Sequence, residues 1–338
     1  EAHALAAEHD YAGAIAGAGV LAQTYPDNLH VTVHAARWES ARGRSTEAVQ
    51  LLQRARAIDV HSVRGMDEYA RLVGQRGDAG ELNRITHELF AIDAQRPECW
   101  VAAALYWESK GDLSRALSYC DKGLQLDDRH VELHLLKGHL AVSLNRLDAA
   151  TSAYRKAQTL RRDLRSFQGL VKVYLAAHKS KEALSMARDA VKMLPISARA
   201  HALLGEVYAR MGEGGRARKV YESALQLDPF CLDAALSLVT LHTEEGRLDA
   251  AASLLQHHLN FEATEVLHSK MGGVMVAGKK YGEALRHYQA ALAINAHSQV
   301  ARVGLERVEK LLKGIDPDAV EEEEEDAPEG EEEESDFI

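Results

Sequence analysis

The chain has 338 residues, of which 46% are hydrophobic and 27% charged, and its formal net charge is −11. A chain of this length exceeds what one compact core usually buries, so it must divide or repeat. Its three widely spaced cysteines form no Cys-x-x-Cys pair and suggest neither a disulfide scaffold nor a thiolate zinc site, and no run of about 18 apolar residues indicates a membrane span.

Residues 1–28 are predicted to supply only the second helix of a two-helix unit. They carry Ala14 and Pro26 at places where later second helices repeat an alanine and a proline. No first helix precedes them, and the chain does not begin with Met. We therefore interpret the sequence as part of a longer chain that starts inside a truncated repeat.

Residues 1 to about 296 follow an internal spacing of 34 or 33 residues. Steps of this size from Ala217 reach alanine at eight of nine places and leucine at the ninth. These nine marker positions are Ala14, Ala48, Leu82, Ala116, Ala150, Ala183, Ala217, Ala251 and Ala284. Five residues before the marker, five units carry a glycine: Gly43, Gly77, Gly111, Gly212 and Gly246. Four residues after the marker, three units carry a tyrosine: Tyr154, Tyr221 and Tyr288.

This pattern predicts pairs of antiparallel helices. A small residue at a fixed place lets two helices approach closely, an aromatic ring fills the space beside it, and glycine makes the turn between them. The pattern resembles the tetratricopeptide repeat. The resemblance implies an all-α fold in which eight repeats, over residues 29–296, stack into a right-handed superhelical solenoid. It also makes the glycine-rich stretch 212–215 a turn between helices rather than a phosphate-binding loop.

Two different segments follow the repeats. Residues 297–314 are predicted to form a C-terminal capping helix, with apolar side chains at helical spacing: Val300, Val303, Leu305 and Val308. Residues 315–338 hold 14 acidic residues and no lysine or arginine, and we expect this acidic tail to be disordered because its charges repel and it has few apolar side chains. The tail could attract a basic partner, screen against nonspecific association, or end in a short ligand built on Phe337 and Ile338.

The charge outside the tail is nearly balanced. Without those 14 residues the 51 acidic side chains fall to 37, against 40 basic ones. This balance gives no electrostatic reason to expect a nucleic-acid partner.

No catalytic or metal-binding arrangement is recognisable in the sequence. His257 and His258 are the densest pair among 17 histidines, but adjacent helical residues point about 100° apart, and no His-Glu-x-x-His motif is present. Glu244 and Glu245 fall at an expected turn, where burial would not raise the pKa of a carboxyl group. We therefore expect no metal, no cofactor and no enzymatic activity.

The ninth place of each repeat, counted with the turn glycine as the fifteenth, belongs to the concave face. Its residues show none of the regularity of a repeat protein that reads one RNA base per unit. The sixth and ninth places also lack the asparagines with which chaperone-binding members of the repeat family hold a peptide carboxylate. The predicted contacts with a protein partner are Arg71, Leu105, His139, Lys172 and Glu206.

Several strings carry a more specific resemblance, in consistent order along nearly the whole chain. They include "RPECWVAAALYWESKGDLSRALSYCDKGLQLD", "FQGLVKVYLA" and "VLHSKMGGVMVAGKKYGEALRHY". These strings are similar to the C-terminal half of the anaphase-promoting complex subunit 7 family. The resemblance implies a non-catalytic scaffold of the cyclosome ubiquitin ligase, present in nucleus and cytoplasm, whose partners are other tetratricopeptide-repeat subunits.

The same family homodimerises through its N-terminal half, so the resemblance implies a homodimer only with that missing half. We expect no membrane and no nucleic acid among the partners. Two alternatives remain open at this point. One is a tetratricopeptide adaptor in a transport or chaperone complex, and the other is a helical-repeat RNA binder.

Overall fold

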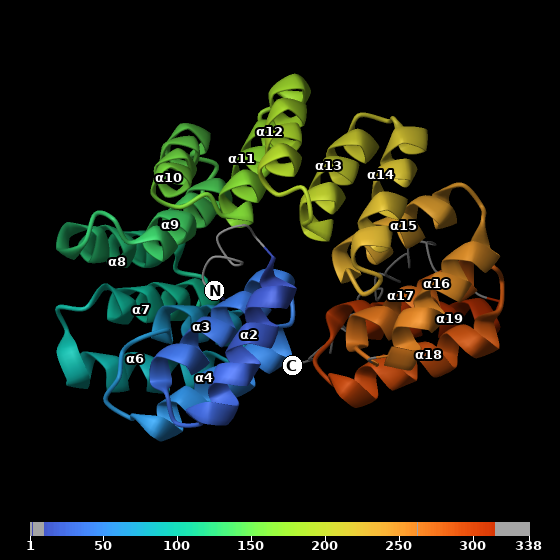
Figure 1. Cartoon of the computed structure of the whole chain (residues 1–338). Helices are drawn as coiled ribbons and strands as arrows, with labels where there is room; N and C mark the ends of the chain where they lie inside the picture. Colours follow the sequence, from blue (N-terminus) through green and yellow to red (C-terminus); the bar gives the residue numbers. More distant parts are fainter. Residues whose placement is uncertain (1, 3–9, 262, 315–338) are drawn as a thin grey trace, which may run out of the picture. The chain divides into compact units, whose positions relative to one another are not determined.

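The fold consists of α-helices arranged in pairs. The computed structural model describes residues 2, 10–261 and 263–314, and this part of the chain contains 18 helices and no β-strand (Figure 1). In chain order the helices are α2 (Tyr11–Thr24), α3 (Leu29–Arg42), α4 (Ser45–Ile58), α5 (Met66–Gln75), α6 (Ala79–Asp93), α7 (Pro97–Ser109), α8 (Leu113–Leu126), α9 (Val131–Ser143), α10 (Leu147–Leu160), α11 (Leu164–Ala176), α12 (Ser180–Met193), α13 (Ala198–Arg210), α14 (Gly214–Leu227), α15 (Leu232–Glu244), α16 (Leu248–Phe261), α17 (Glu265–Ala277), α18 (Tyr281–Ile294) and α19 (Gln299–Leu312). The predicted all-α class is confirmed.

The chain divides into two compact units, residues 1–238 and 239–338. Helices α2 to α14 and the start of α15 belong to the first unit, and the end of α15 with α16 to α19 belongs to the second. Within the first unit, the guanidinium of Arg199 on α13 donates a hydrogen bond to the carbonyl of Ala41 on α3 at 3.4 Å. The first unit therefore curls until helices far apart in sequence meet.

The turn between paired helices has a residue with a positive φ angle at its centre. Five glycines fill this place with φ between 74° and 99°: Gly43, Gly77, Gly111, Gly212 and Gly246. In three other pairs the same place holds Asn145, His178 and Lys279, with φ of 57° to 58°. A residue with a side chain adopts this left-handed conformation at a cost of roughly 1–2 kcal/mol. The three pairs without glycine bear this cost and keep the same backbone turn.

Glycine in place of His178 is expected to raise the free energy of unfolding of the first unit by up to about 1 kcal/mol, because it relieves the left-handed backbone. Urea unfolding followed by circular dichroism measures this gain. The matched control is Ala209→Gly at an exposed position in α13, which should lose stability, because glycine in a helix is about 1 kcal/mol less favourable than alanine. Equal losses for the two variants would contradict the assignment of strain to His178.

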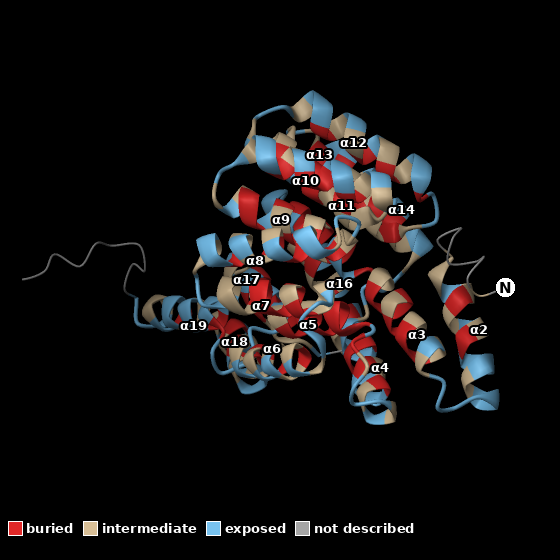
Figure 2. Cartoon of the chain, turned by 90° about the vertical axis from the view of Figure 1, so that its left-hand side faces the viewer, coloured by how far each residue is buried: buried red, intermediate tan, exposed pale blue. Residues whose placement is uncertain are grey.

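The marker positions lie where second helices pack on their neighbours. All nine side chains are 0% exposed, from Ala14 in α2 to Ala284 in α18. Ala183 packs in a cluster with Phe167 and Val207, which come from the helices on either side of α12. Figure 2 shows buried residues on the sides of helices that face other helices. The predicted role of these compact residues is therefore confirmed.

The tyrosine that follows the marker packs directly on glycines of neighbouring first helices. A Cβ atom added to Gly138 on α9 would lie 2.8 Å from the Tyr154 ring, and one added to Gly205 on α13 would lie 2.5 Å from the Tyr221 ring. The Tyr154 ring also covers Gly169 on α11, more closely still. Because it is held between α9 and α11, this ring cannot move aside for an added methyl group.

Replacing Gly169 by alanine is expected to reduce the free energy of unfolding by about 1 kcal/mol. Overpacking against Tyr154 costs about 1–3 kcal/mol, and the better helix propensity of alanine returns about 1 kcal/mol of this. Gly215→Ala is the matched control, because nothing lies within 4 Å of its added Cβ atom. Chemical denaturation should show a loss for the first variant and no loss for the second. A stable Gly169→Ala protein would argue against a fixed Tyr154 ring.

Helix α5 begins late in its repeat and brings two acidic residues to the inner side of the first unit. Gly65, with φ of 77°, stands just before it, and a Cβ atom there would lie 2.8 Å from the side chain of Val33. Asp67 and Glu68 occupy the first helical turn, where the helix dipole favours negative charge. Both residues are buried, with 5% of their surface exposed.

The last helix of the second unit agrees in position with the predicted capping helix but not in every buried side chain. Ala301 and Val308 are fully buried in α19, whereas Val300 is 69% and Val303 51% exposed.

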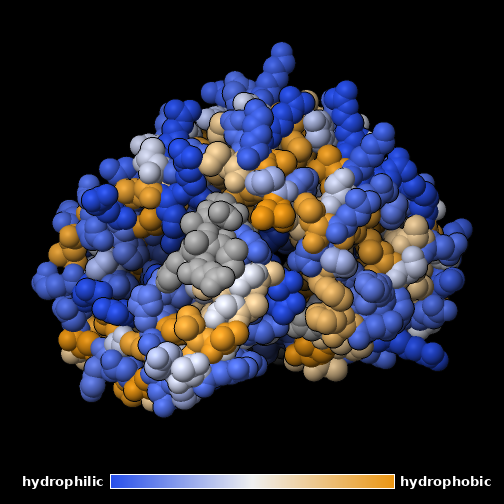
Figure 3. Space-filling view, in the orientation of Figure 1, coloured by the Kyte–Doolittle hydropathy of each residue, from blue (hydrophilic) through white to orange (hydrophobic). Residues whose placement is uncertain are grey.

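On the face shown in Figure 3, hydrophobic residues form small groups among hydrophilic ones, as is normal for a protein surface. The predicted disordered tail, residues 315–338, lies outside the described residues.

Candidate binding groove

Four of the five predicted concave-face residues line one hollow of the first unit. Its cavity volume is about 430 Å³, and it is formed by α5, α7, α9 and α11 with one side chain from α10. We call it the inner groove, and its lining residues are Arg71, Gly74, Gln75, Val101, Leu105, Glu108, Ser109, Glu132, Leu135, Leu136, His139, Tyr154, Arg165, Gln168, Gly169 and Lys172. Glu206, on α13, is not among them.

The floor of the inner groove is apolar and its rim is polar. Leu105, Leu135 and Leu136 are 8–9% exposed, so only a small part of each side chain lines the floor of the groove. Two rim residues bind each other: His139 on α9 is 3.1 Å from the carboxylate of Glu108 on α7. A volume of roughly 300–1,000 Å³ with a few polar groups at its edge is typical of ligand sites in proteins.

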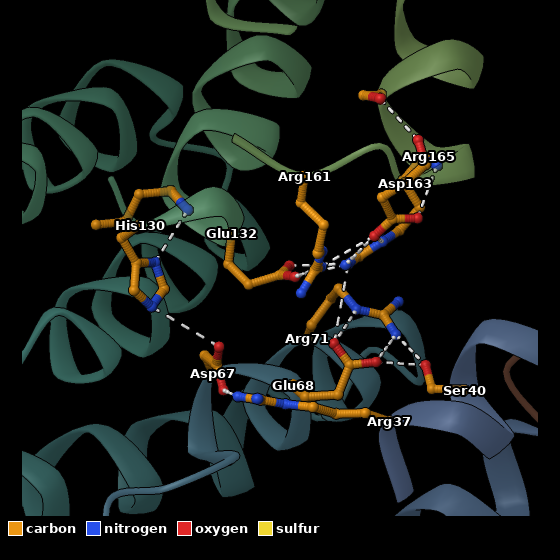
Figure 4. Close-up of polar contacts among 12 residues, drawn as sticks. Arg37, Ser40, Asp67, Glu68, Arg71, His130, Glu132, Arg161, Asp163 and Arg165 are labelled. Carbon is orange, nitrogen blue, oxygen red and sulfur yellow. Dashed lines mark hydrogen bonds and ion pairs between the residues drawn. The ribbon is translucent and has the colours of Figure 1, made fainter. Parts of the chain in front are cut away.

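One side of the inner groove is formed by a group of charged residues that we call the ion network. Figure 4 shows their side chains pointing toward one another from α3, α5, α9, α11 and the residues just before α9 and α11. Its members are Arg37, Ser40, Asp67, Glu68, Arg71, His130, Glu132, Arg161, Asp163 and Arg165. Arg71, Glu132 and Arg165 belong to both the network and the groove.

Glu68 is held from two directions. The Arg71 guanidinium donates to it through Nε at 3.1 Å and through Nη2 at 2.5 Å, and Nη2 also donates to Ser40 Oγ at 2.6 Å. The Ser40 hydroxyl donates to the same carboxylate. Arg165, 97 residues further along the chain, lies 3.8 Å from it. Burial alone would raise the pKa of Glu68, but the Arg71 and Arg165 charges outweigh it and lower this pKa to about 2.

Arg165 is the central cation of the network. It donates a forked pair of hydrogen bonds to Glu132, at 2.8 Å and 2.5 Å, and Nη2 donates to Asp163 at 2.9 Å. Arg161 contacts the same two carboxylates, at 3.3 Å and 2.9 Å. Despite burial, these carboxylates raise the pKa of Arg165 further above its usual value, and the two arginines lower the pKa of Asp163. Fork-to-carboxylate pairs of this kind fix geometry as well as charge.

A smaller branch of the network joins α3 to the start of α9. Arg37 lies 3.5 Å from one carboxylate oxygen of Asp67, and His130 Nε2 lies 3.7 Å from the other. The ring Nδ1 of His130 accepts a hydrogen bond from the backbone N–H of Leu133 and so caps α9. The ion network thus ties together four stretches of chain that are separated by tens of residues: 37–40, 67–71, 130–132 and 161–165.

The network changes the interpretation of the predicted ninth-place residues. Arg37 and Arg71 both stand at this place, and both are engaged with carboxylates of α5. Four arginines face four carboxylates in the network, so its charge is balanced before any partner binds. Sequence reasoning missed the carboxylates because they stand at other places in their repeats.

Three further observations concern the glycine-rich stretch, metal binding and membrane insertion. A shallow hollow lies over Gly212 to Glu222, and within it the Arg216 guanidinium donates to Glu213 at 2.8 Å. In the described part of the chain, no group of three or more His, Cys, Asp or Glu side chains is placed to hold a metal ion. None of the described helices combines the length and apolar character needed to cross a membrane.

A histidine pair links α17 and α18 in the second unit. The Nδ1 atoms of His268 and His287 lie 3.2 Å apart. Burial lowers the pKa of both rings, and for His287 the neighbouring His268 lowers it further, while Glu283 raises it. Neutral rings are therefore favoured in the folded second unit.

We expect the second unit to lose stability as pH falls below about 6.5, the ordinary histidine value. The unfolded chain takes up protons first there, because the folded pKa values of His268 and His287 are lower. Hydrogen exchange of α17 and α18 at about pH 7.5 and about pH 5 measures the effect. A His287→Gln variant serves as the control and should show a smaller change. Equal pH dependence in both proteins would contradict a role for the pair.

Comparison with known proteins agrees with this architecture. Family models described as tetratricopeptide repeat match residues 169–230, 207–263 and 131–164. Together with the helix pairs, the left-handed turns and the buried marker positions, these matches show that the chain is a tetratricopeptide-repeat protein built as a helical solenoid.

Sequence relatives define the group more closely. The chain is 43% identical to anaphase-promoting complex subunit 7 of Arabidopsis thaliana, over 95% of this chain and 58% of that protein. It is 31% identical to anaphase-promoting complex subunit 7 of Dictyostelium discoideum, over 79% of this chain and 46% of that protein. These similarities place the chain in the anaphase-promoting complex subunit 7 family, and it spans about half the length of the curated relatives it matches.

A solved structure shares the fold. The crystal structure of the APC/C hetero-tetramer Cut9–Hcn1 has a chain that superposes with a TM-score of 0.57, over 84% of this chain and 56% of that one. Sequence identity between the two is 18%, so this likeness speaks for the fold alone.

Proposed function

We propose that the chain acts as a non-catalytic scaffold and protein-interaction subunit of the anaphase-promoting complex, a ubiquitin ligase. The observation that carries this proposal is the 43% identity to subunit 7 of Arabidopsis thaliana along 95% of the chain. Its partners would be other tetratricopeptide-repeat subunits of that complex, and its role would be assembly and partner positioning in cell-cycle ubiquitination. We also propose that it resides in the nucleus and cytoplasm.

The structure supports a scaffold in physical terms. Each helix pair uses its marker residue and its left-handed turn for packing on neighbouring helices, and three pairs add a tyrosine ring. Inner-face side chains that neither this packing nor the ion network engages are left for partners. Homodimerisation is proposed only for the whole protein. The chain spans about half the length of these relatives, and the family resemblance assigns the dimer contact to the N-terminal half.

Affinity purification of the tagged chain from dividing cells of its source organism, followed by quantitative mass spectrometry, tests the assembly. Cyclosome subunits should be enriched over a tag-only control. Consistent recovery of transport or chaperone complexes without cyclosome subunits would overturn the proposal in favour of a different tetratricopeptide adaptor. RNA that is retained at low salt and released at high salt would favour an RNA binder instead.

A second assay addresses catalysis. The purified chain should neither accept ubiquitin as a thioester nor accelerate its discharge from a conjugating enzyme. Adding it to a ligase depleted of its subunit 7 should restore assembly or activity. Ubiquitin transfer by the isolated chain would contradict a non-catalytic role.

A further inference from the structure

The histidine pair of the second unit holds two metal-ligating atoms at the spacing that one metal ion requires. Nδ1 of His268, on α17, lies 3.2 Å from Nδ1 of His287, on α18. Zinc binds imidazole nitrogen at about 2.0–2.1 Å, so two such ligands at the tetrahedral angle are about 3.3 Å apart. The observed distance therefore suits two ligands of one ion as well as it suits an N–H···N hydrogen bond between the rings.

The helices that carry the two rings are packed closely together. Tyr288, which follows His287 directly, covers Gly272 of α17, where an added Cβ atom would lie 2.8 Å from its ring, and covers Gly304 of α19 more closely still. The centroids of the two histidine rings are 5.5 Å apart, and both residues are partly exposed, so an ion can reach them from solvent. The pair is thus positioned before an ion arrives, which limits the entropy lost on binding.

A carboxylate stands one helical turn away from the pair. Glu283 lies four residues before His287 and so shares its side of α18. The residue is exposed, and its charge acts on the His287 ring, where it raises the pKa. Only the two Nδ1 atoms are in place as ligands, but rotation of the Glu283 side chain brings a carboxylate oxygen towards them. Two imidazoles and one carboxylate form a ligand set that leaves open positions for water.

From this geometry we propose that His268 and His287 bind one divalent transition-metal ion, of which Zn²⁺ is the representative, and that Glu283 and water complete its coordination. Imidazole selects this class of ion over Mg²⁺ and Ca²⁺, which prefer oxygen ligands. Both Nδ1 lone pairs must face the ion, so the ring that donates the hydrogen bond takes the tautomer protonated at Nε2, and each ring keeps one proton. The ion would join α17 to α18. No sequence motif indicates the site, because its two histidines are 19 residues apart on different helices.

Hydrogen exchange of the full 338-residue chain, measured by mass spectrometry, tests the proposal. The chain is first freed of metal with a chelator and is then titrated with ZnCl₂ at about pH 7.5. We expect exchange in α17 and α18 to slow by at least about threefold, with a midpoint between about 1 and 100 μM Zn²⁺. MgCl₂ at the same concentrations should leave this exchange unchanged, because Mg²⁺ does not prefer imidazole nitrogen.

Substitutions assign the ligands. His287→Gln should raise the Zn²⁺ midpoint about tenfold or more, and Glu283→Gln about threefold, with unchanged circular dichroism. His34→Gln is the matched control: it removes one ring of another histidine pair, on α3, whose centroids lie 4.3 Å apart, and should change the midpoint by less than about twofold. His287→Cys restores a ligand, so it should keep the protection by Zn²⁺. With Co²⁺ it should add a thiolate–cobalt absorption band, which a purely structural role of His287 would not produce and which the chain's own buried cysteines do not supply.

Any of three results would overturn the proposal: no protection of α17 and α18 up to about 1 mM Zn²⁺, equal protection by Mg²⁺, or equal midpoints for His287→Gln and His34→Gln. Protection that appears in α3 instead would assign the ion to His30 and His34 and would count equally against it. Each result can occur while the chain still assembles with cyclosome subunits, so this test fails independently of the proposed scaffold function.

Discussion

Arg165→Met is expected to destabilise the first unit more than any other single change considered, by about 3–5 kcal/mol. The guanidinium binds Glu132 and Asp163 directly and lies 3.8 Å from Glu68. The Glu68 and Glu132 side chains are only 7% and 10% exposed. Removal of the cation leaves buried carboxylates without their main counter-charge, and methionine fills the volume without replacing a single hydrogen bond.

Chemical denaturation near neutral pH measures this loss. The control is Arg216→Met, which removes an arginine whose side chain is 66% exposed and paired with Glu213 on the surface. Exposed pairs contribute at most about 1 kcal/mol, so the control should be nearly neutral. Similar losses in the two variants would show that the ion network is no more than a set of surface contacts.

The pH dependence gives the same prediction a second readout. The pKa of Glu68 is about 2 in the folded protein, below its ordinary value of 4.5. Ionised Glu68 therefore stabilises the fold fully at pH values above 4.5. This contribution is lost as pH falls from 4.5 towards 2, where the unfolded chain binds the proton first. The wild-type first unit should therefore lose more stability over this range than Arg165→Met, in which the folded pKa of Glu68 is less depressed.

The repeat spacing predicted most of the fold because it reports contacts between near neighbours. The marker, the left-handed turn and the place four residues after the marker recur with each unit, and each makes its contact inside its own helix pair or with the next one. The same spacing locates three left-handed turns without glycine. Asn145, His178 and Lys279 stand five residues before a marker, and could have been assigned from position alone.

The inner groove was only partly predictable. Counting ninth places found Arg71, Leu105, His139 and Lys172, because equal places on successive first helices point to the same side. Glu206 follows the same count but is not a lining residue of this groove. The repeat spacing identifies the residues on the inner side of the first unit. Where a groove forms on that side depends on how the successive helix pairs are arranged.

The ion network was not predictable from the period at all. Glu68 and Arg165 stand at different places in their repeats and are 97 residues apart. Their approach depends on how much each helix pair rotates relative to the last, summed over several pairs. The late start of α5 after Gly65 also has no signal in the spacing. Such long-range contacts require coordinates.

Overpacking at a marker position is the second large effect that we expect. Ala217 is 0% exposed in α14, which packs against α13. Leucine at this place adds three carbon atoms where the helices nearly touch, so Ala217→Leu should lower the free energy of unfolding by about 1–3 kcal/mol, at the upper end of that range. Because repeat units couple only to neighbours, hydrogen exchange should increase first in α13 and α14.

The account rests on compact residues placed wherever two helices must pack closely, and one paired measurement tests this directly. Urea unfolding of Ala217→Leu is compared with that of Ala209→Leu, which makes the same substitution at an exposed place on α13. We predict a clear loss of stability for Ala217→Leu and a change within about 0.5 kcal/mol for Ala209→Leu. Equal stability of the two variants would contradict the account.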